Sequence, residues 1–215
     1  MNFDHLCFCY GVWGADPMYQ VGVIRALNSV NQFFPGAKVI VFNEDNAPNV
    51  EDKFCWRLMA SEKDFPGVTH FLYRDADSRI TMREYFAVLE WLASKKAFHF
   101  MRDHPAHFHP VLGGMWGHQK GWFHPEIVRT WFKLESNVGK TGYGVNELLL
   151  EQMVWPMAKL LCLEHGSFNK DKYPNQIPFP TDRFNIPTVG FVGEKLDAND
   201  VANEEHRASR VVACV

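Results

Sequence analysis

The stretch "FLYRDADSRITMREYF", residues 71–86, joins an apolar run to two aspartates, Asp75 and Asp77, that are separated by one alanine. Residues two apart on a strand project to the same face, so both carboxylates can converge where the strand ends. Alone, the two carboxylates raise each other's pKa, whereas a divalent cation between them lets both stay ionised. Oxygen ligands of this kind suit Mn²⁺ or Mg²⁺ and a bound diphosphate. The alternative is that Asp75 pairs with Arg74 or Arg79 and that Asp77 caps the turn.

A third ligand is expected, because two carboxylates rarely hold such a metal without help. His165 closes the last apolar run, "LLCLEHGSF", and we expect it at the same edge of the sheet. A neutral imidazole is an acceptable ligand for Mn²⁺. The alternative for His165 is an ordinary surface-loop histidine.

Residues 102–125 are rich in Gly, Pro, His and Trp and follow a strand candidate that ends near Asp103. The carboxylate of Asp103 is suited to gripping sugar hydroxyls. Gly113 and Gly114 permit a ligand to approach the backbone closely. Trp116 can stack on a sugar face, although simple core packing is its alternative. The histidines of this stretch lack a fourth ligand at the spacing of a closed zinc site.

The elements that position these residues begin with a βαβ unit. Residues 6–10 read as a strand, Asp16 and Pro17 as a helix start, and residues 38–42 as a β-branched strand. A helix crossing between two buried strands implies a parallel sheet with ligands at the carboxyl ends of its strands.

The remaining pattern continues this α/β alternation. Thr81 to Glu84 has the spacing of a capping box at the start of a helix. The pattern predicts helices over 52–61, 85–94, 125–134 and 145–155, strands over 69–73, 96–101 and 159–163, and an irregular stretch over 102–125. We therefore expect one domain over residues 1–193, followed by a tail or the start of a linker to a further domain over residues 194–215.

Composition limits the class of protein. The chain has 215 residues, 47% hydrophobic and 22% charged, with a net charge of -3, which gives no basis for nucleic acid as a partner. No apolar run approaches the ~20 residues that span a bilayer, and the first residues lack the pattern of a signal peptide. Five cysteines without C-x-x-C spacing favour a reducing, cytoplasmic compartment.

Taken together, several segments resemble the DxD glycosyltransferases of the GT-A fold. They are "CYGVWGADPMYQVGVIRALNSVNQFFPGAKVIVF", "FCWRLMAS", "YRDADSRITMREYFAVLEWLAS", "HFMRDHPAHFHPVLGGMWG" and "LEHGSF", which span most of residues 6–193. Within that group the chain looks like the N-terminal glycosyltransferase domains of chlorovirus proteins that build the capsid glycan. The resemblance implies a Rossmann-like GT-A domain with a mostly parallel mixed sheet flanked by helices. It also implies a host-cell cytoplasmic location.

The resemblance also implies a role for each site residue. A UDP-linked donor and a glycan acceptor would be the substrates, with Mn²⁺ or Mg²⁺ on Asp75, Asp77 and His165. Where many relatives have Asp-Gln, this chain has Asn146-Glu147. The predicted catalytic residues are Asp103, Asn146 and Glu147, and the predicted substrate-binding residues are Tyr10, Gly11, Trp13, Asp16, Tyr19, Arg57, Arg79, Asp103, His104, Gly113, Gly114 and Trp116.

The leading functional hypothesis is therefore an inverting or retaining transfer of a hexose or deoxyhexose, glucose- or rhamnose-like, from a UDP-sugar. Retention is favoured, because the sequence places no obvious Asp or Glu as a general base for the acceptor. One alternative is a metal-dependent phosphohydrolase or nucleotidyltransferase. A single D-x-D is fewer carboxylates than a two-metal site of that kind requires. The other alternative is an inactive nucleotide-sugar-binding module, against which Asp75, Asp77 and His165 are all present.

Overall fold

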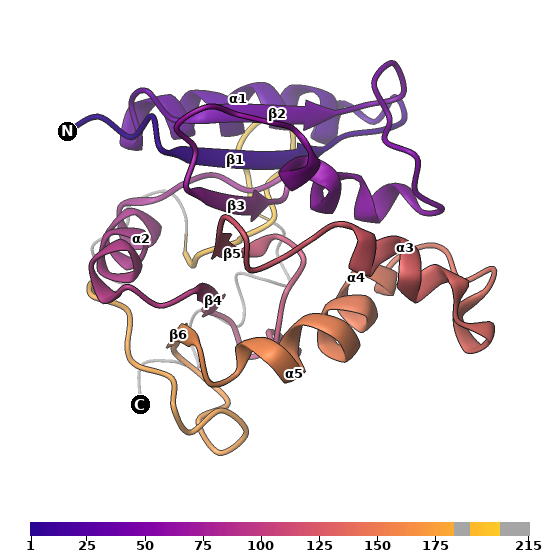
Figure 1. Ribbon diagram of the computed structural model, residues 1–215. Coiled ribbons are helices and arrows are strands. Elements are labelled where there is room, and N and C mark those ends of the chain that lie inside the picture. Colours follow the sequence, from indigo (N-terminus) through magenta and orange to yellow (C-terminus); the bar gives the residue numbers. More distant parts are fainter. Residues whose placement is uncertain (183–189, 203–215) are drawn as a thin grey trace.

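The computed structural model describes residues 1–182 and 190–202 and is built around a six-stranded sheet (Figure 1). Along the sheet the strands follow the order β2-β1-β3-β5-β4-β6, and of these only β5 runs antiparallel to its neighbours. The mixed α/β class predicted from the sequence is confirmed. The strands are β1 (Leu6–Gly11), β2 (Lys38–Phe42), β3 (His70–Arg74), β4 (Phe98–Arg102), β5 (Met115–Gln119) and β6 (Cys162–Gly166).

Helices cover both faces of the sheet, and the alternation of side chains along each strand divides the core in two. On β1, Phe8 packs in the cluster under α1 and α2, whereas Cys7 and Cys9 face the cluster under the other helices. The helical elements are α1 (Pro17–Phe33), η1 (Lys53–Glu62), α2 (Met82–Ser94), α3 (Glu126–Lys133), η2 (Glu135–Asn137), α4 (Val145–Leu149), η3 (Leu150–Val154) and α5 (Trp155–Ala158).

Two predicted helix starts are confirmed in detail. The Asp16 side chain accepts a hydrogen bond from the Met18 backbone N–H at 2.8 Å, and Pro17 is the first helical residue of α1. Thr81 caps α2 by accepting from the Glu84 N–H at 3.2 Å. Both caps stand directly before helices that flank the carboxyl ends of β1 and β3.

Other elements differ from the prediction. The helix expected over 52–61 is present as the 3-10 helix η1, and β6 lies three residues later than expected. The helix expected over 145–155 is interrupted by the π-turn η3, which immediately precedes Trp155-Pro156. Proline lacks an N–H and its ring pushes away the carbonyl four residues back, so a widened turn is the expected response.

Strand β5 lies inside the stretch predicted to be irregular. Its Gly117 is packed so closely that a β carbon there would lie 2.7 Å from the Phe71 carbonyl oxygen. Glycine weakens the strand pattern in sequence, yet here the contact with β3 requires it.

Residues 190–202 pack on the domain rather than extending from it. The Leu196 N–H donates to the Asp77 carbonyl at 2.8 Å, and Asp200 forms ion pairs with Arg25 and Arg79. Residues 194–202, the described part of the predicted tail, thus contact the domain. The remainder of the predicted tail, residues 203–215, lies outside the described residues.

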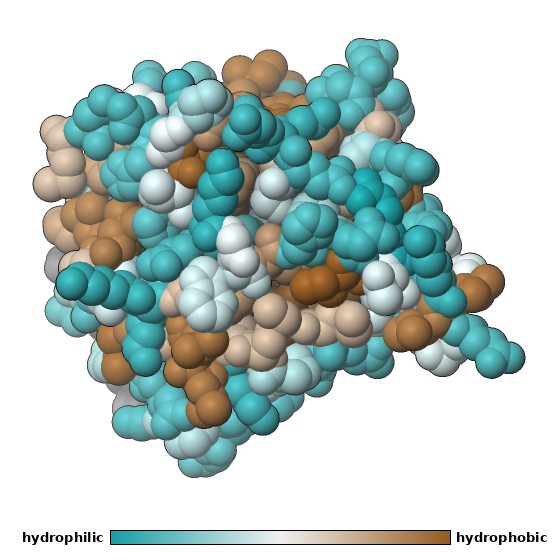
Figure 2. All heavy atoms as spheres, viewed as in Figure 1, coloured by the Kyte–Doolittle hydropathy of each residue, from teal (hydrophilic) through white to brown (hydrophobic). Residues whose placement is uncertain are grey.

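The surface and the cysteines match a compact α/β domain. Hydrophilic residues cover most of the face drawn in Figure 2, with hydrophobic residues gathered in small patches. Among the described residues, no helix has the length and apolar character to cross a membrane. Cys7, Cys9 and Cys55 are buried free thiols, and Cys162 is a half-buried one.

Candidate functional site

The D-x-D pair stands in the turn that follows β3, at the carboxyl edge of the sheet. Asp75 keeps 43% of its side chain exposed, although Arg74 just before it is buried. The buried Arg57 guanidinium from η1 forms an ion pair with Asp75 and donates to the Arg74 carbonyl at 2.9 Å. Asp75 thus has one cationic partner of its own and still presents an open carboxylate surface.

Asp77 is the electrostatically strained member of the pair. Burial, and then the neighbouring charge of Asp75, raise the pKa of Asp77 from 3.8 to about 6. The positive charge of Lys195 lowers this pKa in part. A carboxylate in this position is stabilised by any further cation that approaches both aspartates.

The two adjacent glycines predicted to admit a ligand lie against this pair. A β carbon on Gly114 would collide with the Asp75 carboxylate, and one on Gly113 would collide with the Asn146 amide. Glu147 Oε1 accepts from the Gly113 N–H at 3.2 Å. The predicted residues Asp75, Arg57, Gly113, Gly114, Asn146 and Glu147 therefore form one cluster.

Glu147 is the second perturbed carboxyl of this cluster. Burial and the charge of Asp75 raise its pKa, against the opposing effect of Arg57. The buried Asn146 amide lies beside it on α4. The cluster thus sets the Arg57 guanidinium, with Lys195 nearby, against three acidic side chains, Asp75, Asp77 and Glu147, so a further cation there would be electrostatically favourable.

The loop after β1, expected to hold the nucleotide, forms an aromatic wall next to the pair. A β carbon on Gly11 would lie 3.7 Å from the Arg57 backbone nitrogen, so the β1 end and η1 are in contact. The half-buried Trp13 ring packs edge-on against Phe54 at 4.7 Å and Trp56 at 6.0 Å between centroids. Burial, and then the charge of Asp77, raise the pKa of Tyr19, in the first turn of α1, to about 12.

Other residues of this loop have structural roles. Tyr10 is 1% exposed and packs in the core cluster under α1 and α2, so its side chain does not reach a ligand, contrary to expectation. Burial raises its pKa far above the ordinary value. Asp16 remains exposed as the cap of α1. Gly22 of α1 packs against the turn, because a β carbon there would lie 2.7 Å from the Ala76 carbonyl oxygen.

Two neighbours of the cluster were not predicted. Lys195 lies close enough to affect Asp77, and its amine is 6.0 Å from the Tyr19 ring centroid. Tyr143 is exposed between Gly142 and Gly144, whose φ angles are 103° and 87°. Its ring lies edge-on to Phe54, with the two centroids 6.3 Å apart, which puts it beside the aromatic residues next to the cluster. The glycine-flanked tyrosine in "GKTGYG" is the sequence signal for this residue.

His165 does not join the aspartates, which corrects the predicted three-ligand set. It lies within β6, is fully buried, and has β5 and β4 between it and β3, or about 14 Å at ~4.8 Å per strand. Its Nδ1 is 2.8 Å from His99 Nε2, and its Nε2 is 3.1 Å from a Glu90 carboxylate oxygen. Among the described residues, no three His, Cys, Asp or Glu side chains are arranged to hold a metal.

The prediction that Asp103 contacts the sugar is also wrong. Its side chain is 0% exposed, and both of its carboxylate oxygens accept hydrogen bonds from within the protein. Arg83 donates to both of its oxygens, at 2.8 and 3.1 Å, and Ser167 Oγ donates at 2.5 Å. The Val192 N–H adds a further bond at 3.0 Å. A carboxylate held in this way ties β4 to α2, to the end of β6 and to the 190–202 segment, and it has no open face for a sugar.

Three other predicted substrate contacts face the protein interior. Trp116 is fully buried and stacks on Tyr73, with centroids 4.5 Å apart. His104 is buried beside Phe191. The Arg79 guanidinium donates to the Ala76 and Ser78 carbonyls and pairs with Asp200, so it shapes the D-x-D turn from behind.

Comparison with known proteins gives a fold likeness. No family model matches the chain, and no curated protein sequence matches it. Among solved structures, the chain is similar to one described as a glycosyltransferase involved in the glycosylation of the major capsid of PBCV-1. The TM-score is 0.54 at 14% sequence identity, and the likeness covers 80% of this chain and 91% of the other. At this identity the comparison supports the architecture of the domain.

Proposed function

We propose that this chain is a glycosyltransferase of the GT-A type that moves a sugar from a UDP-linked donor to a glycan acceptor. The observation that carries the proposal is the cluster at the carboxyl edge of β3, where Asp75, Asp77, Arg57 and Glu147 meet a glycine pair. The likeness in fold to the PBCV-1 glycosyltransferase supports it. The choice of uridine as the base of the donor rests on the sequence resemblance to the DxD glycosyltransferases.

The cluster fits a divalent cation shared with a diphosphate. The raised pKa of Asp77 shows that nearby positive charge does not fully compensate this carboxylate, and the Asp75 side chain next to it is partly exposed to solvent. Mg²⁺-type sites commonly use one or two carboxylates and complete their shell with water and substrate phosphates. Mn²⁺ or Mg²⁺ on Asp75 and Asp77 would supply charge to the leaving diphosphate. His165 is not part of this proposal.

The other residues around the aspartate pair are assigned to orienting Asp75 and to binding the donor. Arg57 fixes the orientation of Asp75 through their ion pair, and its position between η1 and β3 keeps that carboxylate at the sheet edge. Gly113 and Gly114 let the Asn146 amide and the Asp75 carboxylate pack directly against the backbone, and we assign the donor sugar to the exposed side of Asp75. Trp13 and Tyr19 form the wall that we assign to the nucleoside.

Glu147 is the catalytic candidate that remains once Asp103 is excluded. Its Oε1 is fixed by the Gly113 N–H, on the donor side of the cluster next to Arg57. There it would stabilise positive charge that develops on the sugar as the diphosphate leaves. This position favours retention of the anomeric configuration, which ¹H NMR of the first product tests directly. Asn146, beside it, would hold a sugar hydroxyl.

The test is an incubation with UDP-glucose, UDP-galactose and other UDP-sugars, with Mn²⁺ or with EDTA, followed by separation of UDP, UMP and phosphate. Glycosyl transfer, or slow hydrolysis in the absence of acceptor, releases UDP only with the metal. Release of phosphate or UMP instead indicates a phosphohydrolase or nucleotidyltransferase. Thermal stabilisation by a UDP-sugar without any turnover indicates a binding module. For an Asp75 or Asp77 variant in this assay, the matched control is Asp45→Asn, which changes an exposed aspartate on a different loop.

A further inference from the structure

Lys195 is a half-buried lysine that lies beside the aspartate pair. It belongs to the 190–202 segment, and the N–H of the next residue, Leu196, donates to the Asp77 carbonyl at 2.8 Å. The Lys195 Nζ lies 6.0 Å from the ring centroid of Tyr19, which is in the first turn of α1. The backbone of Lys195 is therefore next to the D-x-D turn, and its side chain reaches toward the start of α1.

The segment that carries Lys195 is fixed in this position by further contacts. Asp200 pairs with Arg25 of α1 and with Arg79 of the D-x-D turn, at N–O distances of 2.6 and 2.8 Å. The helix α1 itself packs closely on the D-x-D turn at Gly22. Ion pairs to two elements that contact each other thus hold the backbone of Lys195 beside the aspartates.

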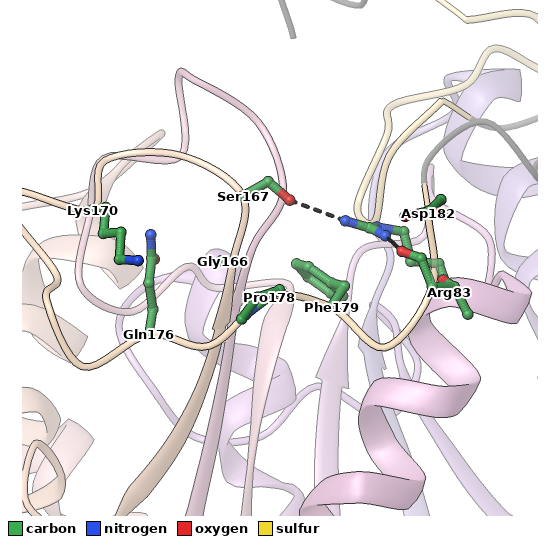
Figure 3. A pocket seen from close by; sticks show the side chains of 9 residues that line it. Arg83, Gly166, Ser167, Lys170, Gln176, Pro178, Phe179 and Asp182 are labelled. Atoms are coloured by element: carbon green, nitrogen blue, oxygen red, sulfur yellow. Dashed lines mark hydrogen bonds between the residues drawn. The ribbon is translucent and has the colours of Figure 1, made fainter. Parts of the chain in front are cut away.

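The ammonium group of Lys195 forms neither an ion pair nor a hydrogen bond with the described residues. By contrast, three arginines along this edge of the sheet have carboxylate partners, in the pairs Arg57–Asp75, Arg79–Asp200 and Arg83–Asp103. Figure 3 shows Arg83, beside a pocket at the end of β6, also bonded to Ser167 Oγ at 3.0 Å. The hydrogen-bond donors of Lys195 are therefore available to a ligand that binds at the aspartates.

The charge of Lys195 acts on Asp77 in the metal-free protein. It lowers the pKa of Asp77, although burial and the charge of Asp75 leave that pKa raised overall to about 6. Lys195 is thus a partial counter-ion of the aspartate pair. A divalent cation on the same carboxylates would repel the ammonium group, whereas the oxygens of a diphosphate would accept hydrogen bonds from it.

We propose that Lys195 binds the diphosphate of the donor, and that in the empty site it takes part of the place of the metal as counter-ion of the aspartates. This inference rests on the proposed function, which supplies both the diphosphate and the cation on Asp75 and Asp77. It makes the predicted tail a source of a substrate-binding residue. It also couples the two ligands, because Lys195 disfavours the metal alone and favours the metal together with the diphosphate.

The test measures binding without turnover in the wild type and in Lys195→Met, which keeps an unbranched side chain and removes the charge. Mn²⁺ alone is titrated at pH 7.5 and followed by the EPR signal of the free ion, and UDP is titrated by calorimetry at saturating Mn²⁺. The variant should bind Mn²⁺ alone about two- to tenfold more tightly, because a repelling charge is gone. It should bind UDP roughly 10- to 150-fold more weakly, the value of a hydrogen bond between charged groups.

These opposite changes distinguish ligand binding from a structural role, because a loss of packing would weaken the binding of both ligands. Lys195→Arg keeps the charge and should bind UDP within about fivefold of the wild type. The control is Lys38→Met, which removes an exposed lysine at the start of β2, on the opposite edge of the sheet, and should bind both ligands as the wild type does.

UDP affinity that is unchanged in Lys195→Met, or Mn²⁺ affinity that does not rise, overturns the proposal even if the wild type transfers sugar. Lys195-dependent binding of UDP and Mn²⁺, with no release of UDP from any UDP-sugar by the wild type, overturns the proposed function alone.

Discussion

Replacing Asp77 with Asn gives the sharpest test of the candidate site, because it should stabilise the metal-free protein. The pKa of Asp77 is raised from 3.8 to about 6, so the folded state holds its proton more tightly than the unfolded chain does. This contribution to stability is present below pH 3.8, falls as the pH rises, and is lost above about pH 6. At neutral pH, the ionised Asp77 carboxylate therefore lowers the free energy of unfolding, whereas the neutral Asn side chain does not.

The magnitude follows from the shift. About two pKa units at ~1.36 kcal/mol each correspond to about 3 kcal/mol, which partial exposure to solvent reduces to roughly 1–3 kcal/mol. For a domain of this size, that gain raises Tm by roughly 2–12 °C at pH 7.5. At pH 5, wild-type Asp77 is mostly protonated in the folded state, and about half of the gain should remain.

The assay is thermal or urea unfolding of the wild type and Asp77→Asn at pH 5 and 7.5, with EDTA and then with UDP and Mn²⁺. A ligand at 100 times its Kd stabilises the wild type by about 2.7 kcal/mol, and the variant should lose most of that effect. Asp45→Asn should change neither the stability in EDTA nor the stabilisation by UDP and Mn²⁺. Equal or lower stability of Asp77→Asn at pH 7.5 would refute the reasoning, because the carboxylate would then be favourably paired without metal.

Three further outcomes are expected. Asp103→Asn should lower the free energy of unfolding by about 3–5 kcal/mol in urea, because it breaks a buried ion pair with Arg83; full stability with reduced turnover would return Asp103 to the active site. Glu147→Gln should reduce turnover by about tenfold or more without changing the affinity for UDP, which lacks the sugar. His165→Gln should leave the Mn²⁺-dependent affinity for UDP unchanged, and a large loss would place His165 on the metal after all.

Much of the donor cluster is predictable from sequence because it follows local rules. A D-x-D at the end of an apolar run, a glycine pair and a capped helix start each report a backbone geometry within a few residues. The structure brings Asp75 and Gly114 together at the sheet edge, and Arg57, which only the family resemblance implied, pairs with Asp75. Lys195 was missed because its segment carries no periodic pattern, and only its tertiary contacts place it near Asp77.

The misassigned residues have a common physical cause, which is burial. Asp103 and His165 also stand at or near the carboxyl ends of strands, and sequence alone cannot distinguish an open strand end from a covered one. Asp103 meets Arg83 and Ser167 above it, and His165 is enclosed by His99 and Glu90. A charged or polar side chain in such a place serves the packing, because its bonding capacity is filled from within the protein.

The topology explains why the end of β3 stays open. From β1, the chain crosses through α1 on one face of the sheet to reach β2, then returns past η1 on the other face to β3. Where consecutive connections leave on opposite faces, the loops diverge and a crevice forms outside the carboxyl ends of the strands. In this sheet the connections diverge between the ends of β1 and β3, at Gly11 and Asp75. Gly114, just before the reversed strand β5, has no side chain to displace the Asp75 carboxylate, which therefore stays open at this edge of the sheet.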